Sequence, residues 1–432
     1  MNGDRQDTFP AGQLWACFRN GPFTRYLAGS AASLTGSWMQ VMAQGWVMTT
    51  LTTSAFMLGL VNFATGIPML LLALKAGVLA DRMDKRYILL VAQVLQIGCA
   101  LFVGWLVASG QVQVWHIIAV AFFLGLVFAF EMPAINALVP ELVNREQIAT
   151  AITLDRSVFH GTRLIGPAVA GYVVAHWGEA NAFFVNAFSY LALIAALLTI
   201  RLPPRSAAVK EAVARGGIRE GLRYAQSDLP TLAMMGLMAL STLVVFPVLV
   251  VMLPIYARHT LELPPDRMGW LMGLTALGSF TGAVGLLAIP MRHRRRVFFT
   301  MVIGVGGSLV GLAFAPGFWW AVPPLILLAL CVSTLVGLAH IIIQERAPSQ
   351  LRGRICAIAG LCFFGLMPFA SLALPAIADL LGLRSALAVG ACVYVVAGLP
   401  IVLARSSRTW DVPRPVAPPA TPRSAPPPTE DW

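Results

Sequence analysis

The chain has 432 residues, of which 58% are hydrophobic and only 11% are charged, with a formal net charge of +11. A soluble globular protein carries about 25% charged residues. So few charges could not cover the surface of a soluble protein of this length, and so high a hydrophobic content excludes a disordered chain. The composition therefore predicts an integral membrane protein.

Long charge-free segments separate the charged residues. Three of them, at 26–74, 87–130 and 297–344, each have room for two spanning helices and a turn, because one span needs about 20 residues. Single spans are expected at 148–176, 180–200, 229–257, 268–291, 355–378 and 385–404. All must be helical, because lipid offers the backbone no hydrogen-bond partner. The expected fold is an all-α integral membrane protein with twelve transmembrane helices.

The basic residues predict the orientation in the membrane. With a cytoplasmic N-terminus, the loops on the outer side keep only Arg258, Arg267 and Arg384, as the positive-inside rule requires. We therefore expect a multi-pass protein of the plasma (inner) membrane with both termini in the cytoplasm. The net positive charge then belongs to a face that meets anionic lipid, and no nucleic-acid partner is expected.

The chain divides around one long polar segment. The expected parts are a cytoplasmic segment 1–25, a six-helix bundle 26–200, a cytoplasmic linker 201–228, a six-helix bundle 229–404 and a Pro-rich cytoplasmic tail 405–432. The two bundles resemble each other at an offset of 208 residues, which relates Gly77 to Gly285 and Pro140 to Pro348. Parallel halves of this kind indicate a transporter whose site lies at the midplane between them.

The segment from Gly77 to Arg86 reads GVLADRMDKR. It resembles the signature loop G-x-L-a-D-r-x-x-r-r of the major facilitator superfamily. This resemblance implies two pseudo-repeated six-helix bundles and a charge latch between the halves. The latch would be formed by Gly77, Asp81, Arg82, Lys85 and Arg86. The alternative is that these charges serve only to orient the protein in the membrane.

The segment 161–171 reads GTRLIGPAVAG and resembles the antiporter motif in the fifth helix of proton-coupled drug exporters. The residues that carry this resemblance are Gly161, Arg163, Gly166, Pro167 and Gly171. Glycine and proline in such a helix allow a bend and close helix packing, although ordinary small-residue packing is an alternative. Further matches resemble the enterobactin-exporter-like branch of drug and siderophore exporters. The resemblance implies export.

Polar side chains within the spans indicate a cavity. Ser33, Ser37, Gln40 and Gln44 share one face of the first span, and such residues inside a membrane usually face protein or water. In the superfamily the first and tenth spans line the cavity together. The cavity-lining candidates are Ser37, Gln40, Gln44, Ser333 and His340. Hydrogen bonding between helices, with no substrate involved, is the alternative.

Two acidic residues are candidates for proton coupling. Glu131 is the only acid between Arg86 and Glu141, and Asp155 lies where the exporter branch usually has an uncharged residue. A carboxyl group removed from water binds a proton more readily, so either residue could carry one during transport. For Glu131 the sequence favours a structural ion pair with Arg145 or Arg163, because charges inside membranes commonly pair.

No motif for an enzyme is present. The chain has no phosphate-binding loop and no protease or esterase motif, and its six cysteines have no metal-site spacing. No cofactor or metal is expected, and the energy source would be a proton gradient. We expect a monomeric, proton-coupled efflux transporter of a small, partly apolar molecule (a drug, siderophore or secondary metabolite) that works by alternating access. The alternatives are an importer of the same fold and a non-transporting receptor or scaffold.

Overall fold

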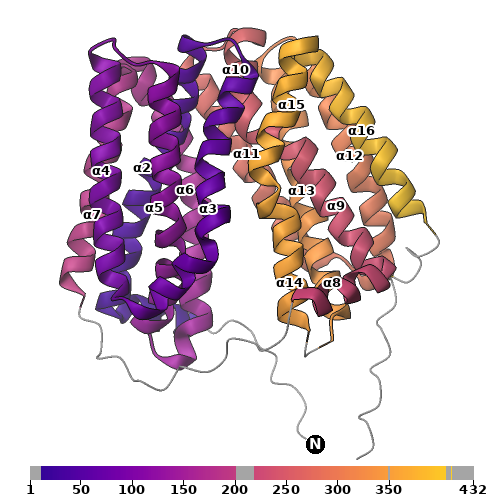
Figure 1. Ribbon diagram of the computed structural model, residues 1–432, viewed down its shortest axis with the longest axis horizontal. Coiled ribbons are helices and arrows are strands. Elements are labelled where there is room, and N and C mark those ends of the chain that lie inside the picture. The colour runs from indigo at the N-terminus through magenta and orange to yellow at the C-terminus, as the bar shows by residue number, and fades with distance from the viewer. Residues whose placement is uncertain (1–10, 201–217, 349–350, 405–409, 411–432) are drawn as a thin grey trace, which may run out of the picture.

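The computed structural model describes residues 11–200, 218–348, 351–404 and 410. Within this part the helices form two groups that stand side by side (Figure 1). The first group, indigo to magenta, contains α2 (Gly21–Leu51), α3 (Ala55–Arg82), α4 (Lys85–Ala108), α5 (Val114–Leu138), α6 (Ile148–Trp177) and α7 (Glu179–Thr199). A short helix, α1 (Ala11–Arg19), precedes α2, and the one-turn helices η1 (Val139–Leu142) and η2 (Arg145–Gln147) join α5 to α6.

The second group, red to yellow, begins with the short helix α8 (Ile218–Ser227). Its first long element runs through α9 (Leu229–Phe246), η3 (Pro247–Met252), α10 (Leu253–Ile255) and η4 (Tyr256–Thr260). It continues with α11 (Pro265–Gly285), η5 (Leu286–Ala288), η6 (Met291–His293), α12 (Arg294–Phe314), α13 (Phe318–Arg346), α14 (Arg352–Gly360), η7 (Leu361–Gly365), α15 (Met367–Leu381) and α16 (Leu383–Leu403).

Ten helical segments in the described part are long and apolar enough to cross a membrane. The two remaining long helices, α2 and α6, have 31 and 30 residues, which exceeds the about 20 residues that a crossing needs. They are more polar than the others because they carry the polar stripe and the charges of the predicted spans one and five. The all-helical fold class is confirmed, and the ten apolar segments together with α2 and α6 agree with twelve predicted spans.

Helix ends in the two groups are built alike. Gly178 between α6 and α7 and Gly382 between α15 and α16 have φ angles of 90° and 84°, a left-handed backbone that favours glycine. Gly382 follows Gly178 by 204 residues. Asn20 and Asp228 cap the first long helix of each group, because their side chains accept from the backbone N–H three residues later. These pairs agree with the repeat predicted at an offset of 208 residues.

Polar side-chain contacts repeat in the same way. The Ser37 Oγ lies 3.2 Å from the Tyr190 hydroxyl, and the Ser241 Oγ lies 2.8 Å from the Tyr394 hydroxyl. Both pairs are separated by 153 residues. An ion pair joins the start of α4 to η1 through Lys85 and Glu141, and Arg294 and Glu345 form its counterpart between α12 and α13. The two groups are therefore structural repeats.

The two groups contact each other mainly toward one end of the molecule. We call the end at which α2 begins and α16 ends the terminal face, and the opposite end the distal face. At the distal face α6 packs along α11, and α3 packs along α15. In Figure 1 the groups converge at the top, near α10, and diverge toward the terminal face at the bottom.

Candidate functional site

A cavity of about 360 Å³ lies between the two groups. Its wall follows α2 from Met48 near the distal face to Tyr26 near the terminal face. Within the part of the chain that the structure describes, the second group contributes only Val250, Val251, Pro254 and Met272. The four residues from the second group lie in the distal parts of their helices. The volume falls within the range of about 300–1,000 Å³ that is usual for small-molecule sites.

Among the described residues, the polar side chains that line the cavity all come from the first group, which also supplies apolar ones such as Leu34, Leu124 and Phe128. All four lining residues from the second group are apolar, and three of them lie in or beside η3, a π-helical segment that begins at Pro247. Such segments occur frequently at functional sites. The first group supplies every polar lining residue, namely Tyr26, Ser30, Ser33, Ser37, Gln40, Gln44, Asn62, Thr65, Gln96, Glu131, Asn136, Asp155, Arg156 and Tyr190, together with Trp38, whose indole carries an N–H. An amphipathic molecule can therefore direct its polar part to the first group, while its apolar part can contact either group.

Glu131 lies in the polar wall and is only 6% exposed. Its carboxylate oxygens accept hydrogen bonds from Gln93 Nε2 at 2.7 Å and from Gln96 Nε2 at 2.5 Å. No ion pair to Glu131 exists among the described residues, so the ion pair with Arg145 or Arg163 that the sequence favoured is not found. Arg163 instead lies over the Trp38 ring at 5.5 Å. Two neutral amides satisfy this carboxylate in place of a cation.

Asp155, the second candidate for proton coupling, lies at the cavity wall nearer to the terminal face. The Tyr26 hydroxyl donates to its Oδ1 at 3.1 Å. The neighbouring Arg156 donates to the Asn136 side chain at 2.8 Å and lines the same cavity. Asp155 therefore has a charged neighbour and a more open position than Glu131.

The polar stripe of the first span faces this cavity at Ser37, Gln40 and Gln44. Gln40 accepts a hydrogen bond from Asn186 of α7. Ser333 and His340 on α13 are not among the residues that line the cavity, and Ser333 donates to the Ser279 carbonyl instead. Their absence follows from the divergence of the groups, which leaves only the distal ends of the second group at the cavity.

The predicted antiporter motif packs against both groups. A Cβ atom at Gly166 would lie 2.6 Å from the Trp38 Cβ on α2, and one at Gly171 would lie 2.7 Å from the Pro265 carbonyl oxygen of α11. Conversely, a Cβ at Gly269 of α11 would lie 2.3 Å from the carbonyl oxygen of Pro167. The Arg163 guanidinium of the motif lies over the Trp38 ring of α2. A Cβ atom at Gly161 would meet open space. The motif thus forms a close helix-to-helix seam between the groups.

The predicted latch lies at the terminal end of α3 and the start of α4. Lys85 pairs with Glu141, and the Arg86 guanidinium donates to the Leu198 carbonyl at 2.8 Å, so both bind within the first group. Gly77 lies within α3. The side chains of Asp81 and Arg82 lie outside the described residues. A latch between the two groups stays a prediction.

Polar contacts close the distal face between the groups. The His259 Nε2 lies 3.1 Å from the carbonyl oxygen of Thr49, and the Arg258 guanidinium lies 4.7 Å over the Trp46 ring. Asp379 at the end of α15 accepts hydrogen bonds at the N-terminus of α3. The Ser371 hydroxyl donates to the Gly59 carbonyl along the same α3–α15 seam. These contacts join the two groups on the distal side of the cavity.

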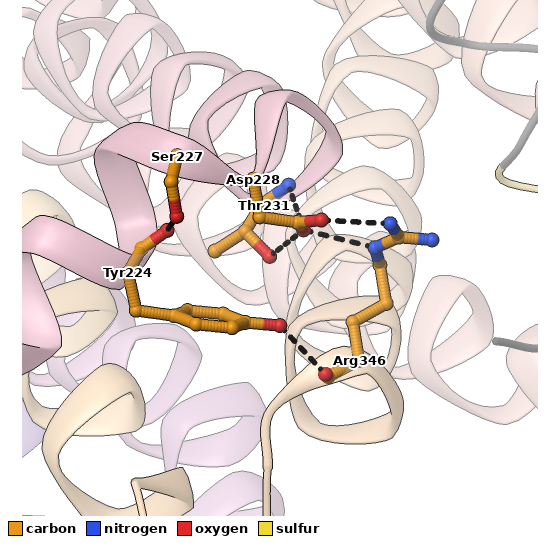
Figure 2. A network of polar contacts seen from close by, with 5 residues as sticks. All are labelled: Tyr224, Ser227, Asp228, Thr231 and Arg346. Atoms are coloured by element: carbon orange, nitrogen blue, oxygen red, sulfur yellow. Dashed lines mark hydrogen bonds and ion pairs between the residues drawn. The ribbon is translucent and has the colours of Figure 1, made fainter. Parts of the chain in front are cut away.

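A polar network fixes the linker side of the second group (Figure 2). Asp228 accepts two hydrogen bonds from the Arg346 guanidinium, at 2.8 and 3.0 Å, and caps α9 through Thr231. The Tyr224 hydroxyl of α8 donates to the Arg346 carbonyl at 2.8 Å. Burial raises the pKa of Asp228, but the hydrogen bonds from Arg346 and Thr231 outweigh burial and hold it below its usual range. The network ties α8, α9 and α13 together at the terminal face.

Sequence comparison agrees with this architecture. The profile of a family described as transmembrane secretion effectors matches residues 12–416. The chain belongs to this family of the major facilitator superfamily. It is therefore a multi-pass membrane transporter and not an enzyme, as the sequence predicted.

Several characterised relatives share most of its length. The multidrug efflux pump Tap of Mycolicibacterium fortuitum is 26% identical over 385 residues, which cover 85% of this chain and 91% of that pump. The staphyloferrin A transporter of Staphylococcus aureus is 24% identical and covers 83% of this chain and 90% of its own length. The macrolide efflux protein A of Streptococcus pyogenes is 24% identical, with 83% and 89% covered.

Solved transporter structures share the fold. A bacterial homologue of the human lysosomal transporter Spinster, in an inward-facing and unoccupied conformation, superposes with a TM-score of 0.68 at 14% identity, over 92% of this chain and 99% of that one. The nucleoside transporter NupG gives a TM-score of 0.67 at 12% identity, with 88% and 98% covered. At these identities the likeness shows the fold alone.

Sequence reasoning missed Gln93 and Gln96, which hold Glu131. Both are only 1% exposed, although they lie on α4, a helix without charges beyond its first turn. A signal was present, because two amides three residues apart share one face of a helix. Amides in a lipid-facing position would be costly, so the pair indicates a buried polar partner.

Proposed function

We propose that this protein exports a small, partly apolar compound from the cytoplasm in exchange for protons. The observation that carries the proposal is Glu131, a buried carboxylate without an ion pair among the described residues, at the wall of a cavity between two rocking halves. Such a carboxylate can change its charge during the cycle, whereas an acid held by a buried cation is costly to neutralise. Asp155 is the second candidate for the proton-carrying group.

The orientation follows from the basic residues. Arg86, Arg145, Arg294 and Arg346 lie toward the terminal face, and Arg258 and Arg267 lie toward the distal face. Adding the residues of the termini and linker, the positive-inside rule favours a cytoplasmic terminal face. The cavity, on whose distal side the two groups are joined, would then receive its substrate from the cytoplasm. The latch of Gly77, Asp81, Arg82, Lys85 and Arg86 would hold the halves together in the opposite conformation.

The substrate would be amphipathic, because the cavity is lined by both polar and apolar side chains. A drug, a siderophore or a secondary metabolite meets this description, and the relatives include a multidrug pump, a macrolide exporter and a siderophore transporter. We expect the protein to work as a monomer, since both cavity walls come from one chain.

Inside-out membrane vesicles with an imposed proton gradient test the proposal. A panel of macrolides, siderophores and cationic dyes should include a compound that the vesicles accumulate. Its uptake should be accompanied by the exit of protons from the vesicle lumen. Glu131→Gln should abolish the exit of protons. Glu146→Gln, which removes an exposed acid of η2 at the terminal face, should leave it unchanged.

Accumulation that is found only in right-side-out vesicles would show an importer and reject export. Transport that is unchanged in both Glu131→Gln and Asp155→Asn would reject proton coupling through this cavity. Absence of transport in either orientation, for a protein that is present and folded, would favour the receptor or scaffold alternative.

A further inference from the structure

A chain of hydrogen bonds connects Glu131 on α5 to Ser33 on α2 through α4. The Ser33 hydroxyl donates to the Gln93 Oε1 at 3.1 Å, and the Gln93 Nε2 donates to the Glu131 Oε1 at 2.7 Å. The Gln96 Nε2 donates to the other carboxylate oxygen, Oε2, at 2.5 Å. All four side chains are buried, with at most 6% exposure.

In this network of hydrogen bonds, Glu131 is the acceptor of both amides. An ionised carboxylate can only accept, so both amides present N–H to Glu131 and direct their carbonyl oxygens away from it. The Gln93 oxygen is taken by Ser33, and the Gln96 oxygen lies 3.4 Å from the Gln93 Nε2. The arrangement therefore suits the charged form of Glu131.

A proton that arrives on Glu131 does not fit this arrangement. The protonated carboxyl must donate its O–H, but each amide beside it presents another donor. One amide has to turn its oxygen toward Glu131. If Gln93 turns, the Ser33 hydroxyl loses its acceptor; if Gln96 turns, its NH₂ group meets the NH₂ group of Gln93. The turn of Gln93 breaks the bond to α2 directly, whereas the turn of Gln96 breaks the contact between the two amides and disfavours the present orientation of Gln93. Both are costly, because an unmade buried hydrogen bond is costly.

α2 connects the Ser33 bond to the cavity and to the other group. Its middle lines the cavity at Ser37, Gln40 and Gln44, and its distal end contacts Arg258 and His259 of the other group. The amides of α4 have no equivalent in the second group: its counterpart there, α12, buries Phe298, Val302 and Val305 and carries no glutamine or asparagine. This hydrogen-bonded network is therefore present in the first group and not in the described part of the second.

We propose, on the basis of the proposed function, that Gln93 and Gln96 are positioning residues that transmit the protonation of Glu131 to α2 through Ser33. The other titratable groups that face this part of the cavity are Tyr26 on α2, Tyr190 on α7, and Asp155 and Arg156 on α6. α3 faces the cavity with Asn62 and Thr65, which do not titrate.

The test measures proton binding and the response of α2 separately. A Gln44→Cys reporter, in a full-length chain whose six native cysteines are replaced, is labelled with N-ethylmaleimide at mildly acidic and mildly alkaline pH. The infrared band of a protonated carboxyl, identified by its loss in Glu131→Gln, reports proton binding. The labelling rate of each protein is divided by the rate of the same protein carrying Glu131→Gln at the same pH, so that the ionisation of the thiol itself cancels. For the parent this corrected labelling rate should change about fivefold between the two conditions, a factor that corresponds to one hydrogen bond.

Ser33→Ala should keep the infrared titration but lose most of the change in labelling rate. Gln93→Leu should lose the same change, whereas Thr35→Ala, which removes a hydroxyl of α2 that bonds only the Ala31 carbonyl among the described residues and does not line the cavity, should keep it. A pH response of α2 in Ser33→Ala and Gln93→Leu as large as in the parent would overturn the inference. A parent protein without a Glu131 band or without a pH response would overturn both the inference and Glu131 as the proton site.

Discussion

Asp379 of α15 caps the N-terminus of α3, at Ser54, in the other half of the molecule. Its carboxylate accepts from the Ser54 hydroxyl at 2.5 Å and from the backbone N–H groups of Ala55 and Phe56 at 2.6 and 3.1 Å. A carboxylate at a helix N-terminus also interacts favourably with the helix dipole. A single residue of one group thus completes a helix end of the other group and closes the distal face.

Removal of this cap should favour opening at the distal face. In Asp379→Ala we expect a cysteine at Gln44 to react about fivefold faster with an impermeant maleimide added from the distal side, because charged hydrogen bonds that exist only in the closed state are lost. Glu262→Gln, which removes an exposed acid on the same face, should leave the rate unchanged. Equal rates in Asp379→Ala and the parent would show that the cap does not hold the closed state.

The Asp228–Arg346 pair should contribute strongly to stability. Asp228→Ala removes a helix cap and leaves the guanidinium of Arg346, whose side chain is only 13% exposed, without its carboxylate. We expect a loss of about 3 kcal/mol or more in the free energy of unfolding. Asp228→Asn, which keeps an oxygen for the cap, should lose less.

Thermal unfolding in detergent measures this effect, and Asp84→Ala provides the matched control. Asp84 caps α4 with one backbone bond and is exposed, so its loss should cost about 1 kcal/mol. A cost for Asp228→Ala no greater than the cost for Asp84→Ala would show that the ion pair adds nothing to the cap.

The same pair predicts how stability depends on pH. Burial raises the pKa of Asp228, but the bonds from Arg346 and Thr231 hold it below its usual range, and therefore below its value in the unfolded chain. The stabilisation is complete above about pH 4, where an unfolded aspartate is ionised, and is lost as the pH falls further. The difference in melting temperature between the parent and Asp228→Asn should be constant near neutral pH and shrink below pH ~4. A difference that is unchanged on acidification would contradict this role.

The glycine seam between α6 and α11 should not tolerate even a methyl group. Gly269→Ala places a Cβ against the Pro167 carbonyl oxygen, so the helices must separate, at a cost of about 1–3 kcal/mol. We expect a lower melting temperature and slower transport. Gly161→Ala on α6 meets open space and should be neutral or slightly stabilising, because alanine favours helix. Equal effects of the two substitutions would reject the seam as the cause.

The positions of the helices were largely predictable, whereas the partners of individual polar groups were not. A charge-free segment of about 20 residues has to be a membrane helix, so composition alone located α4 and α13. The polar stripe of Ser37, Gln40 and Gln44 likewise predicted a shared face, because helical spacing is fixed. These predictions depend only on the periodicity of one helix.

Contacts between helices depend on how neighbouring helices are rotated and placed against each other, which the spacing of residues along one helix does not give. An acid inside a membrane predicts some partner, but not whether it is Arg163 or the amides of Gln93 and Gln96. Ser333 was predicted to line the cavity together with the stripe on α2, yet its hydroxyl donates to the Ser279 carbonyl of α11. A different conformation of the same sequence would bring different residues to the wall.

The described polar side chains of the cavity all come from the first group, which has a consequence for how such a protein diversifies. The apolar side chains of Val250, Val251, Pro254 and Met272 take no part in the hydrogen bonds of Glu131, so their size and shape can change while those hydrogen bonds are preserved. We expect mutations selected for an altered substrate range to accumulate on the second half of the chain.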